Sequence, residues 1–344
     1  MESEPLLRAG LIGCGYQGQW LARAATALDG YRLVACHDPD EKAVEATAAI
    51  ADVAIESSAA DVIQRKDVDV VFIATPHHLL QPYALQAIRA GKHVLAEKPI
   101  ALNAAEAMEL ETALGDHTVT YMAGYSFRYL PPVAEAKRLI AEGVIGEVQT
   151  ISAGMSIRGV RPGWVADPAA GGGILGFYGC HLVDRVLWFL GDAPVEVSAH
   201  VTYHPDYGVD VTSLFQITFA RGAVAQFNIC GSATGMFDFA HFCGREGHLY
   251  LAMTAVPNYS LTVSSPGKEA YAVPKTTATA VDRATAIQQK MEAELRDFAA
   301  AVWERQPPPI TASDGRRVLQ VLDGVIASGL SRKPVPLGEA AANR

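Results

Sequence analysis

Three glycines near the start of the chain have the G-x-G-x-x-G spacing of a loop that can hold a phosphate group. The first glycine permits a tight turn, the second lets backbone amides approach a pyrophosphate, and the third lets a helix pack close to the preceding strand. The phosphates would lie at the N-terminus of that helix. The expected cradle consists of Gly13, Gly15, Tyr16, Gln17 and Gly18.

A carboxylate follows this loop at the distance that a dinucleotide requires. Asp38 stands 20 residues after Gly18, at the end of an apolar run, where it could accept hydrogen bonds from the adenosine ribose hydroxyls. Asp38, Asp40 and Glu41 would repel a ribose 2′-phosphate, so the sequence predicts NAD and makes NADP less favoured. An alternative remains open, in which Asp38 only caps the following helix.

The surrounding elements alternate between strand and helix patterns. Short apolar runs at 8–13, 31–38 and 68–76 are separated by segments of helical composition, and an amphipathic stretch at 77–91 leads into another run at 92–99. Such repetition is typical of βαβ units in a parallel sheet that is buried on both faces. We therefore expect a doubly wound Rossmann sheet.

Polar residues follow two of these strands. In parallel sheets, ligands bind beyond the carboxyl ends of the strands, because those ends meet at one edge. This places Thr75, Pro76, Glu97, Lys98 and Pro99 along one edge of the predicted sheet.

A second set of polar side chains is predicted on a helix in the middle of the chain. In residues 174–191, the spacing puts Phe177, His181, Asp184 and Arg185 on one side of that helix. A histidine has an ordinary pKa of about 6.5, which suits proton exchange near neutral pH. His181 is therefore a candidate acid or base.

The order of these motifs resembles the Gfo/Idh/MocA family, named after glucose-fructose oxidoreductase, inositol dehydrogenase and a rhizopine-catabolism protein. The matching segments are the glycine loop, Asp38, ATP at 74–76, AGKHVLAEKP at 90–99, GYSFRYLP at 124–131, EGVIGEV at 142–148, and GGG at 171–173 followed by His181 and Asp184. The resemblance implies an α/β fold: an NAD-binding Rossmann domain, here 1–124, then an α+β domain, 125–344, with a large, mainly antiparallel open sheet.

The second half of the chain is compatible with such a sheet. Segments of strand length and pattern stand at 147–157, 195–204, 211–219, 223–230, 237–243 and 248–253, and helices are expected at 292–304 and 314–330. One face of a wide sheet would remain open, and family members commonly pair through it. We expect a homodimer or homotetramer formed through this sheet.

The resemblance also implies catalytic roles. It directs Lys98 toward the nicotinamide ribose and the reactive hydroxyl, and it makes His181 the acid or base on that hydroxyl. A lysine exchanges protons near neutral pH only where burial or a neighbouring positive charge lowers its pKa. Otherwise Lys98 would donate hydrogen bonds without titrating.

The sequence departs from the family where many members carry a substrate-binding Asp, because Phe177 occupies that position. Phe177 accepts no hydrogen bond, so either the substrate is less polar there, or Tyr178, Asp184 or Arg185 replaces the contact. Ser126 likewise stands where relatives often have Asn.

Aromatic rings stack on the C–H faces of sugars. The expected substrate residues are Arg128, Trp164, Phe177, Tyr178 and Asp184, with Tyr125 as a further aromatic neighbour.

These features predict an NAD-dependent dehydrogenase or reductase acting on a secondary alcohol or ketone of a sugar, polyol or related compound. One alternative is a glycosidase or lyase that oxidises its substrate transiently, eliminates, and restores the cofactor. A non-catalytic dinucleotide-binding regulator is the other. Retention of Lys98 and His181 disfavours the regulator.

Composition narrows the partners and the compartment. The net charge is −9 and no Lys/Arg cluster could follow a phosphate backbone, so we expect no nucleic-acid partner. The acidic N-terminus and the lack of an apolar run near ~20 residues predict no signal peptide, no membrane span and a cytoplasmic protein. Five cysteines without CxxC spacing predict reduced thiols and no metal site.

Overall fold

The computed structural model describes residues 5–338 except 116, 234 and 255–257. These residues form two units, each with its own sheet. The first unit comprises the chain up to residue 126 together with residues 287–317, and the second comprises residues 127–286 and the chain from residue 318 onward.

The first unit contains a six-stranded sheet in which every pair of neighbours is parallel. Its order is β3-β2-β1-β4-β5-β6. The strands are β1 (Leu7–Ile12), β2 (Tyr31–His37), β3 (Ala54–Ile55), β4 (Val70–Ile73), β5 (His93–Glu97) and β6 (Tyr121–Gly124). All four residues of β4 are buried, as the continuous apolar run at 68–76 predicts for a central strand. The Rossmann prediction is confirmed.

Helices connect these strands: α1 (Tyr16–Thr26), α2 (Glu41–Ala48), α3 (Ala59–Gln64), α4 (His77–Arg89) and α5 (Ala104–Gly115). Local capping fixes two of their starts. The Asp40 side chain accepts from the backbone N–H of Lys42 at the start of α2, and the Ser58 side chain accepts from that of Asp61 in α3. Each bond satisfies an amide that the helix itself leaves without a partner.

A helix from the far end of the chain completes the first unit. α8 (Arg283–Glu304) groups with this unit from residue 287 onward. The hydroxyl of Tyr31 donates to the Leu295 carbonyl at 2.7 Å, and the ring of Phe298 lies 6.4 Å from that of Phe72. Tertiary packing decides this grouping. No sequence pattern in residues 283–304 indicates which sheet the helix packs against.

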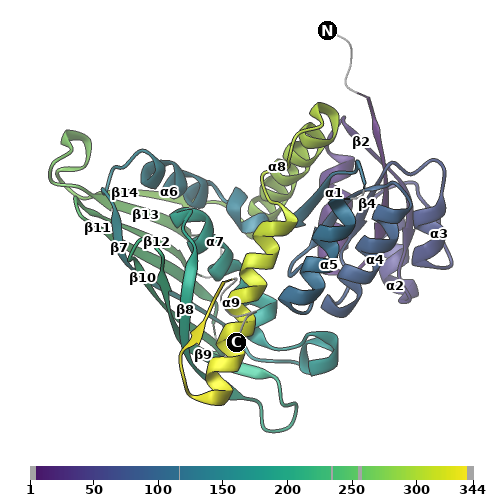
Figure 1. The fold of residues 1–344 in the computed structure, drawn as a ribbon. Helices are drawn as coiled ribbons and strands as arrows, with labels where there is room; N and C mark the ends of the chain where they lie inside the picture. The colour runs from purple at the N-terminus through teal and green to yellow at the C-terminus, as the bar shows by residue number, and fades with distance from the viewer. Residues whose placement is uncertain (1–4, 116, 234, 255–257, 339–344) are drawn as a thin grey trace. The chain divides into compact units, whose positions relative to one another are not determined.

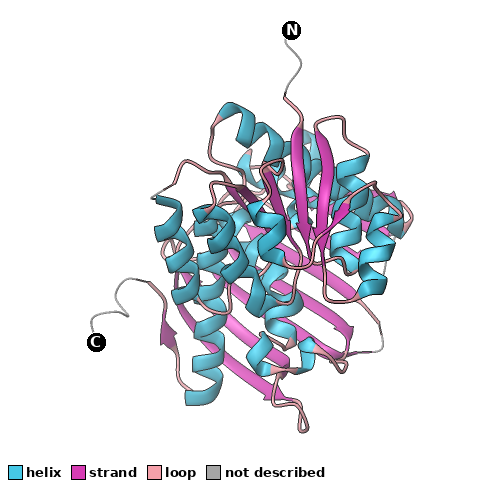
Figure 2. Ribbon diagram, turned by 90° about the vertical axis from the view of Figure 1, so that its right-hand side faces the viewer, coloured by secondary structure: helices cyan, strands magenta, loops and turns pink. Residues whose placement is uncertain are grey.

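The second unit is built on a nine-stranded sheet of order β14-β13-β12-β11-β7-β10-β9-β8-β15. Among the described residues, β7 and β10 pair in parallel and the other neighbours are antiparallel. Figure 2 shows these strands in magenta. They are β7 (Val148–Arg158), β8 (Pro194–Tyr203), β9 (Asp210–Phe219), β10 (Val224–Ala233), β11 (Phe237–Gly244), β12 (His248–Thr254), β13 (Asn258–Ser264), β14 (Lys275–Ala280) and β15 (Val335–Pro336).

Helices cover one face of this sheet and leave the other open. α6 (Pro131–Ala141) and α7 (Cys180–Leu190) lie on the same side of it (Figure 1), and α9 (Ala312–Ser331) joins the second unit beyond residue 317. Along β9 the side chains alternate: Phe215 and Ile217 are buried, whereas Leu214 and Gln216 are exposed. The predicted open, mainly antiparallel sheet is confirmed.

The stretch Pro168–Leu190 is long and apolar enough to cross a membrane by composition, with a mean hydropathy of 1.2. The sequence predicts a helix at 174–191, overlapping this stretch, but no apolar run long enough to span a membrane. Its most apolar window is 72% buried within the fold, which is typical of a core helix.

Short helical turns lead into and out of these elements. They are η1 (Ser126–Tyr129), η2 (Trp164–Ala166), η3 (Pro168–Ala170), the π-helical turn η4 (Leu175–Gly179) and η5 (Glu269–Tyr271).

Candidate active site

The loop between β1 and α1 has the geometry of a phosphate cradle. Gly13 has a φ of +94°, and a Cβ there would lie 2.5 Å from the carbonyl oxygen of Ala74. A Cβ at Gly18 would come even closer to the backbone, at 1.9 Å from the carbonyl oxygen of Gly13. A Cβ at Gly15 would have no neighbouring heavy atom of the described residues within 4 Å. The backbone at Gly15 is therefore open to the approach of a ligand.

The first turn of α1 follows this space directly. Tyr16 and Gln17 begin the helix, Gly15 is its N-cap, and no side chain caps it. Amides at a helix N-terminus without such a cap suit an anion. The side chain of Gln17 reaches away from the loop, and its Nε2 donates to Oε1 of Glu97 at 2.8 Å.

Asp38 lies just beyond the end of β2 and is half-buried. Its Oδ2 accepts from the backbone N–H of Cys14 at 2.8 Å, and its Oδ1 accepts from that of Asp40 at 2.9 Å. These bonds fix the carboxylate beside the glycine loop. The alternative that Asp38 caps the next helix is wrong, since Asp40 is the N-cap of α2.

The carboxyl ends of β4 and β5 lie side by side, as the parallel register Ile73↔Ala96 shows. Thr75 and Pro76 follow β4, and α4 begins at the next residue. Glu97 ends β5, and the Lys98–Pro99 peptide bond after it is cis. The residues predicted along this edge are thus brought together.

Lys98 is buried to 9% exposure, although lysine is among the residues that proteins most rarely bury. Its backbone N–H lies 3.3 Å from Oε2 of Glu97. Since Glu97 also accepts from Gln17, the turn that carries Lys98 is connected to the glycine loop through one carboxylate.

In the second unit, His181 lies in the first turn of α7 and is 4% exposed. Its ring stacks on that of Phe127, with centroids 4.1 Å apart and planes 10° apart. Phe127 belongs to η1 and stands within the GYSFRYLP segment, but its sequence context gave no reason to single it out.

Asp210, at the start of β9, holds the segment that leads into this helix. Its Oδ2 accepts from the backbone N–H groups of Ile174 and Leu175 at 3.1 and 2.7 Å. A Cβ at Gly173, where φ is +107°, would lie 2.1 Å from Oδ1 of Asp210. Burial raises the pKa of Asp210 to about 6 despite the hydrogen bonds. The sequence carries no signal for this contact.

Two of the predicted substrate residues pair with each other. Arg128 donates from Nε to Oδ2 of Asp184 at 2.9 Å and from a second nitrogen to Oδ1, and both side chains are buried. The guanidinium carbon of Arg128 also lies 5.1 Å from the centre of the Trp188 ring. Arg185, the next residue on α7, pairs instead with the fully buried Asp238 at 2.6 Å.

The aromatic residues predicted near the substrate form one cluster in the second unit. The ring of Phe177 meets that of Trp164 edge-on at 5.4 Å and that of Tyr178 edge-on at 4.7 Å. All three are half-buried, so part of their surface faces solvent. Tyr125 belongs to the first unit and is completely buried.

Comparison with known families assigns both halves of the chain to one family. Residues 7–125 match the model described as "Oxidoreductase family, NAD-binding Rossmann fold", and residues 133–250 match "GFO/IDH/MocA C-terminal domain". Together these matches span more than half of the sequence. The chain belongs to the GFO/IDH/MocA family.

Individual members of the family are about a quarter to a third identical to this chain over the segments that align. Levoglucosan dehydrogenase of Pseudarthrobacter phenanthrenivorans is 29% identical over 71% of this chain and 73% of its own length. The 2,7-anhydro-N-acetylneuraminate hydratase of Escherichia coli is 32% identical over 64% of this chain and 60% of its own length. The crystal structure of an oxidoreductase domain protein from Kribbella flavida is 26% identical, covers 97% of this chain and 100% of its own, and superposes with a TM-score of 0.88.

The residues of this GFO/IDH/MocA member fit the nicotinamide dinucleotide NAD. Open space at Gly15, the amides at the start of α1 and the carboxylate of Asp38 supply the three features that such a cofactor requires. The negative charges of Asp38, Asp40 and Glu41 favour NAD over its 2′-phosphorylated form.

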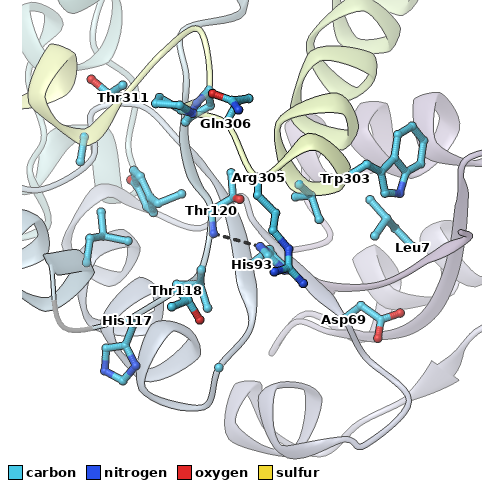
Figure 3. Close-up of a pocket in the computed structure, with 18 of the residues that line it drawn as sticks. Leu7, Asp69, His93, His117, Thr118, Thr120, Trp303, Arg305, Gln306 and Thr311 are labelled. Carbon is cyan, nitrogen blue, oxygen red and sulfur yellow. Dashed lines mark hydrogen bonds between the residues drawn. The ribbon is translucent and has the colours of Figure 1, made fainter. Parts of the chain in front are cut away.

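A large cavity of about 1340 Å³ lies elsewhere in the first unit. It is lined by the amino ends of β1, β5 and β6, where Leu7, His93 and Tyr121 stand, and by Arg305 and Gln306 (Figure 3). Strand direction therefore places it at the opposite edge of the sheet from the glycine loop. None of the predicted site residues lines it.

The cysteines of this family member are free thiols. Cys14, Cys36 and Cys180 are buried, whereas Cys230 and Cys243 are half-buried. Within the described ranges, no three His, Cys, Asp or Glu side chains are grouped in a way that could hold a metal ion.

Proposed function

We propose that this GFO/IDH/MocA protein is an NAD-dependent dehydrogenase or reductase that acts on a secondary alcohol or ketone of a sugar, polyol or related compound. The observation that carries the proposal is the buried Lys98, held next to Glu97, whose carboxylate is bound to Gln17 of the glycine loop. Proteins rarely bury a lysine, so a buried lysine whose turn is connected to a dinucleotide loop supports a chemical role.

Bound NAD would accept the hydride from the alcohol carbon. The chain must then hold the hydroxyl and take its proton. We assign the first task to Nζ of Lys98, which donates a hydrogen bond to the substrate oxygen. The contact between the backbone N–H of Lys98 and Glu97 holds the turn from which this side chain extends.

His181 takes the hydroxyl proton on its imidazole. Stacking on Phe127 fixes the plane of the ring, and Asp210 fixes the backbone through which the chain enters α7. Asp184, about one turn after His181 on α7, forms the ion pair with Arg128. These contacts keep the imidazole in one orientation, which proton transfer requires.

The cluster of Trp164, Phe177 and Tyr178 supports a substrate with an exposed C–H face. Phe177 replaces a hydrogen-bonding residue, so this side of the site favours a less polar surface. Anhydro-sugars present such a face because an internal ether replaces two hydroxyls. The similarity to levoglucosan dehydrogenase is compatible with this substrate class.

The test is a screen of polyols, aldoses and anhydro-sugars with NAD and NADP, read as formation of the reduced cofactor. With the best substrate, Lys98→Ala and His181→Ala should lower kcat by roughly 10²-fold or more while NAD still binds. Lys66→Ala, at an exposed lysine of the first unit, is the matched control and should leave kcat unchanged. Full turnover in Lys98→Ala would contradict the assignment, and NAD binding without turnover of any compound would favour the regulator.

A second candidate function is elimination after transient oxidation. The similarity to 2,7-anhydro-N-acetylneuraminate hydratase favours it. Oxidation of one hydroxyl to a ketone would make the neighbouring C–H acidic, so that removal of this proton would expel the leaving group. Water would then add to the resulting enone, and reduction of the ketone would restore the hydroxyl, with bound NAD supplying the hydride exchange. Product analysis separates the two: this reaction converts an anhydro-sugar or glycoside without accumulation of reduced cofactor, whereas a dehydrogenase forms one reduced cofactor for each product.

We further propose that two chains, or four, associate through the open face of the nine-stranded sheet, and that the protein works in the cytoplasm. Leu214, Phe237 and Tyr250 are 45, 41 and 40% exposed on that sheet, and an apolar surface of this kind is usually covered. Light scattering should give a dimer or tetramer, and Leu214→Lys should shift it toward monomer. A monomeric native protein would contradict this assignment.

A further inference from the structure

Four buried polar side chains gather next to the turn that carries Lys98, all within the first unit. Ser126, Lys290, Glu97 and Glu294 are 1, 6, 7 and 0% exposed. Two of them come from α8, where a spacing of four residues puts Lys290 and Glu294 on one side of the helix. Neither α8 residue belongs to a motif that the sequence analysis recognised.

Both carboxyl oxygens of Glu97 lie beside hydrogen-bond donors. One oxygen accepts from Nε2 of Gln17 at 2.8 Å, and the other lies 3.3 Å from the backbone N–H of Lys98. Both neighbours are donors. The ammonium group of Lys290 donates to the hydroxyl of Ser126 at 2.7 Å.

Glu294 has a different environment. Both of its carboxyl oxygens are buried, and neither has a hydrogen-bond partner among the described residues. A carboxylate buried in this way is far less stable than the neutral acid. Burial first, and then repulsion from Glu97, raise the pKa of Glu294 well above its ordinary value, while attraction from Lys290 lowers it.

Two further groups face Glu294. Asp297, on the same helix, adds a smaller repulsion that also raises the pKa of Glu294. Tyr31 approaches from β2, and burial raises the pKa of its phenol, with a further contribution from Glu294. Asp297 therefore opposes a negative charge on Glu294, whereas Lys290 favours one.

We propose that Glu294 is a neutral carboxylic acid, kept protonated by its burial without a hydrogen-bond partner among the described residues and by the neighbouring carboxyl group of Glu97, so that it adds no negative charge next to the Lys98 turn. This inference rests on the proposed function, in which Lys98 binds the reacting oxygen. A negative charge on Glu294 would hold the Lys98 ammonium more tightly and draw it away from the substrate. Glu294 is therefore a positioning residue, which acts through Glu97.

The direct test is infrared spectroscopy of the native protein. A protonated carboxylic acid has a C=O stretch that a carboxylate lacks, so the wild-type protein should show this band at neutral pH and Glu294→Gln should lose it. Glu292→Gln, which removes a partly exposed carboxylate from the same helix, is the control and should keep it. Absence of the band from the wild-type protein at neutral pH would overturn the proposal.

The effect of Glu97 on the proton of Glu294 is tested by titrating the band. In Glu97→Gln the repelling charge is gone, so the pH at which the band disappears should move down by about one unit or more. An unchanged midpoint would show that Glu97 does not influence Glu294 and would overturn the coupling of the two carboxyl groups. Should Glu97→Gln not fold, the pH profile of kcat decides: Glu294→Gln should match wild type at neutral pH and keep its activity about one unit further into the alkaline range.

The two proposals fail separately. A band that behaves as expected, together with full turnover in Lys98→Ala, would remove Lys98 from the reaction and leave the neutral Glu294 in place. A missing band, together with loss of turnover in Lys98→Ala, would keep the proposed function and remove the neutral acid.

Discussion

The ring of Phe127 lies flat against the imidazole of His181, 4.1 Å away, so a residue of η1 fixes the plane of the side chain that we assign to proton transfer. Phe127→Leu keeps apolar contact but removes this flat surface. We expect kcat to fall by about tenfold, with NAD affinity unchanged, because the imidazole gains rotational freedom. Stopped-flow and steady-state kinetics measure this change. Phe127→Tyr keeps the ring and is the control; an equal loss in both variants would contradict a role in stacking.

Substitution by alanine should have different effects at two glycines of the loop, Gly18 and Gly15. Gly18→Ala places a methyl group against the carbonyl oxygen of Gly13, so we expect a loss of at least ~2 kcal/mol of unfolding free energy even without cofactor. Gly15→Ala meets open space, and its unfolding free energy should be nearly unchanged, but NAD binding should weaken. Urea unfolding and calorimetric titration separate the two effects. Wild-type NAD affinity in Gly15→Ala would place the pyrophosphate elsewhere.

Asp38 should decide between the two nicotinamide dinucleotides. Asp38→Asn keeps an acceptor for the backbone N–H of Cys14 but removes the charge that repels a 2′-phosphate. We expect the ratio of the Kd values for NADP and NAD to fall by about tenfold or more, which is ~1.4 kcal/mol. Fluorescence titration with both cofactors measures it. Asp40→Ala should instead lower the stability of α2, with a smaller change in the ratio.

The raised pKa of Asp210 predicts that the free energy of unfolding depends on pH in a specific way. Burial raises its pKa to about 6 in the folded protein, above the ordinary value of 3.8. The native state therefore binds this proton more tightly than the unfolded chain does, and the stabilisation is complete below pH 4 and lost as the pH rises to about 6. Relative to Asp210→Asn, the wild type should lose on the order of 3 kcal/mol over that range.

Chemical denaturation at several pH values tests this dependence. Asp206→Asn, at an exposed aspartate in the loop before β9, is the control and should follow the wild type. A wild-type curve parallel to that of Asp210→Asn would show that Asp210 does not titrate in this range.

Variants of the ion pair between Arg128 and Asp184 distinguish a structural role of Asp184 from a substrate-binding role. Asp184→Asn leaves the buried guanidinium without its carboxylate, so we expect a loss of about 3 kcal/mol in unfolding free energy. The double variant Arg128→Leu with Asp184→Leu should recover part of this loss. If Asp184→Asn instead unfolds like the wild type and raises KM, Asp184 contacts the substrate.

Local chemistry explains why the first half of the fold follows from sequence. The roles of Gly13, Gly15 and Gly18 depend on a turn of six residues, and the buried strand β4 is visible as a continuous apolar run. The position of Asp38 depends only on the length of one helix and one strand. Each of these features is fixed by neighbours close in the chain, so their spacing is sufficient to predict them.

Sequence by itself thus determined the NAD loop, the two kinds of sheet and the candidate pair of Lys98 and His181. Tertiary structure alone decided the surroundings of the buried polar groups: Arg128 pairs with Asp184, Asp210 holds the start of the π-helical turn, and Glu294 of α8 lies near Glu97, which repels it. These contacts join residues between 35 and 197 positions apart in the chain. No local pattern encodes such a contact, because the cost of burying a charge depends on the groups that folding places around it.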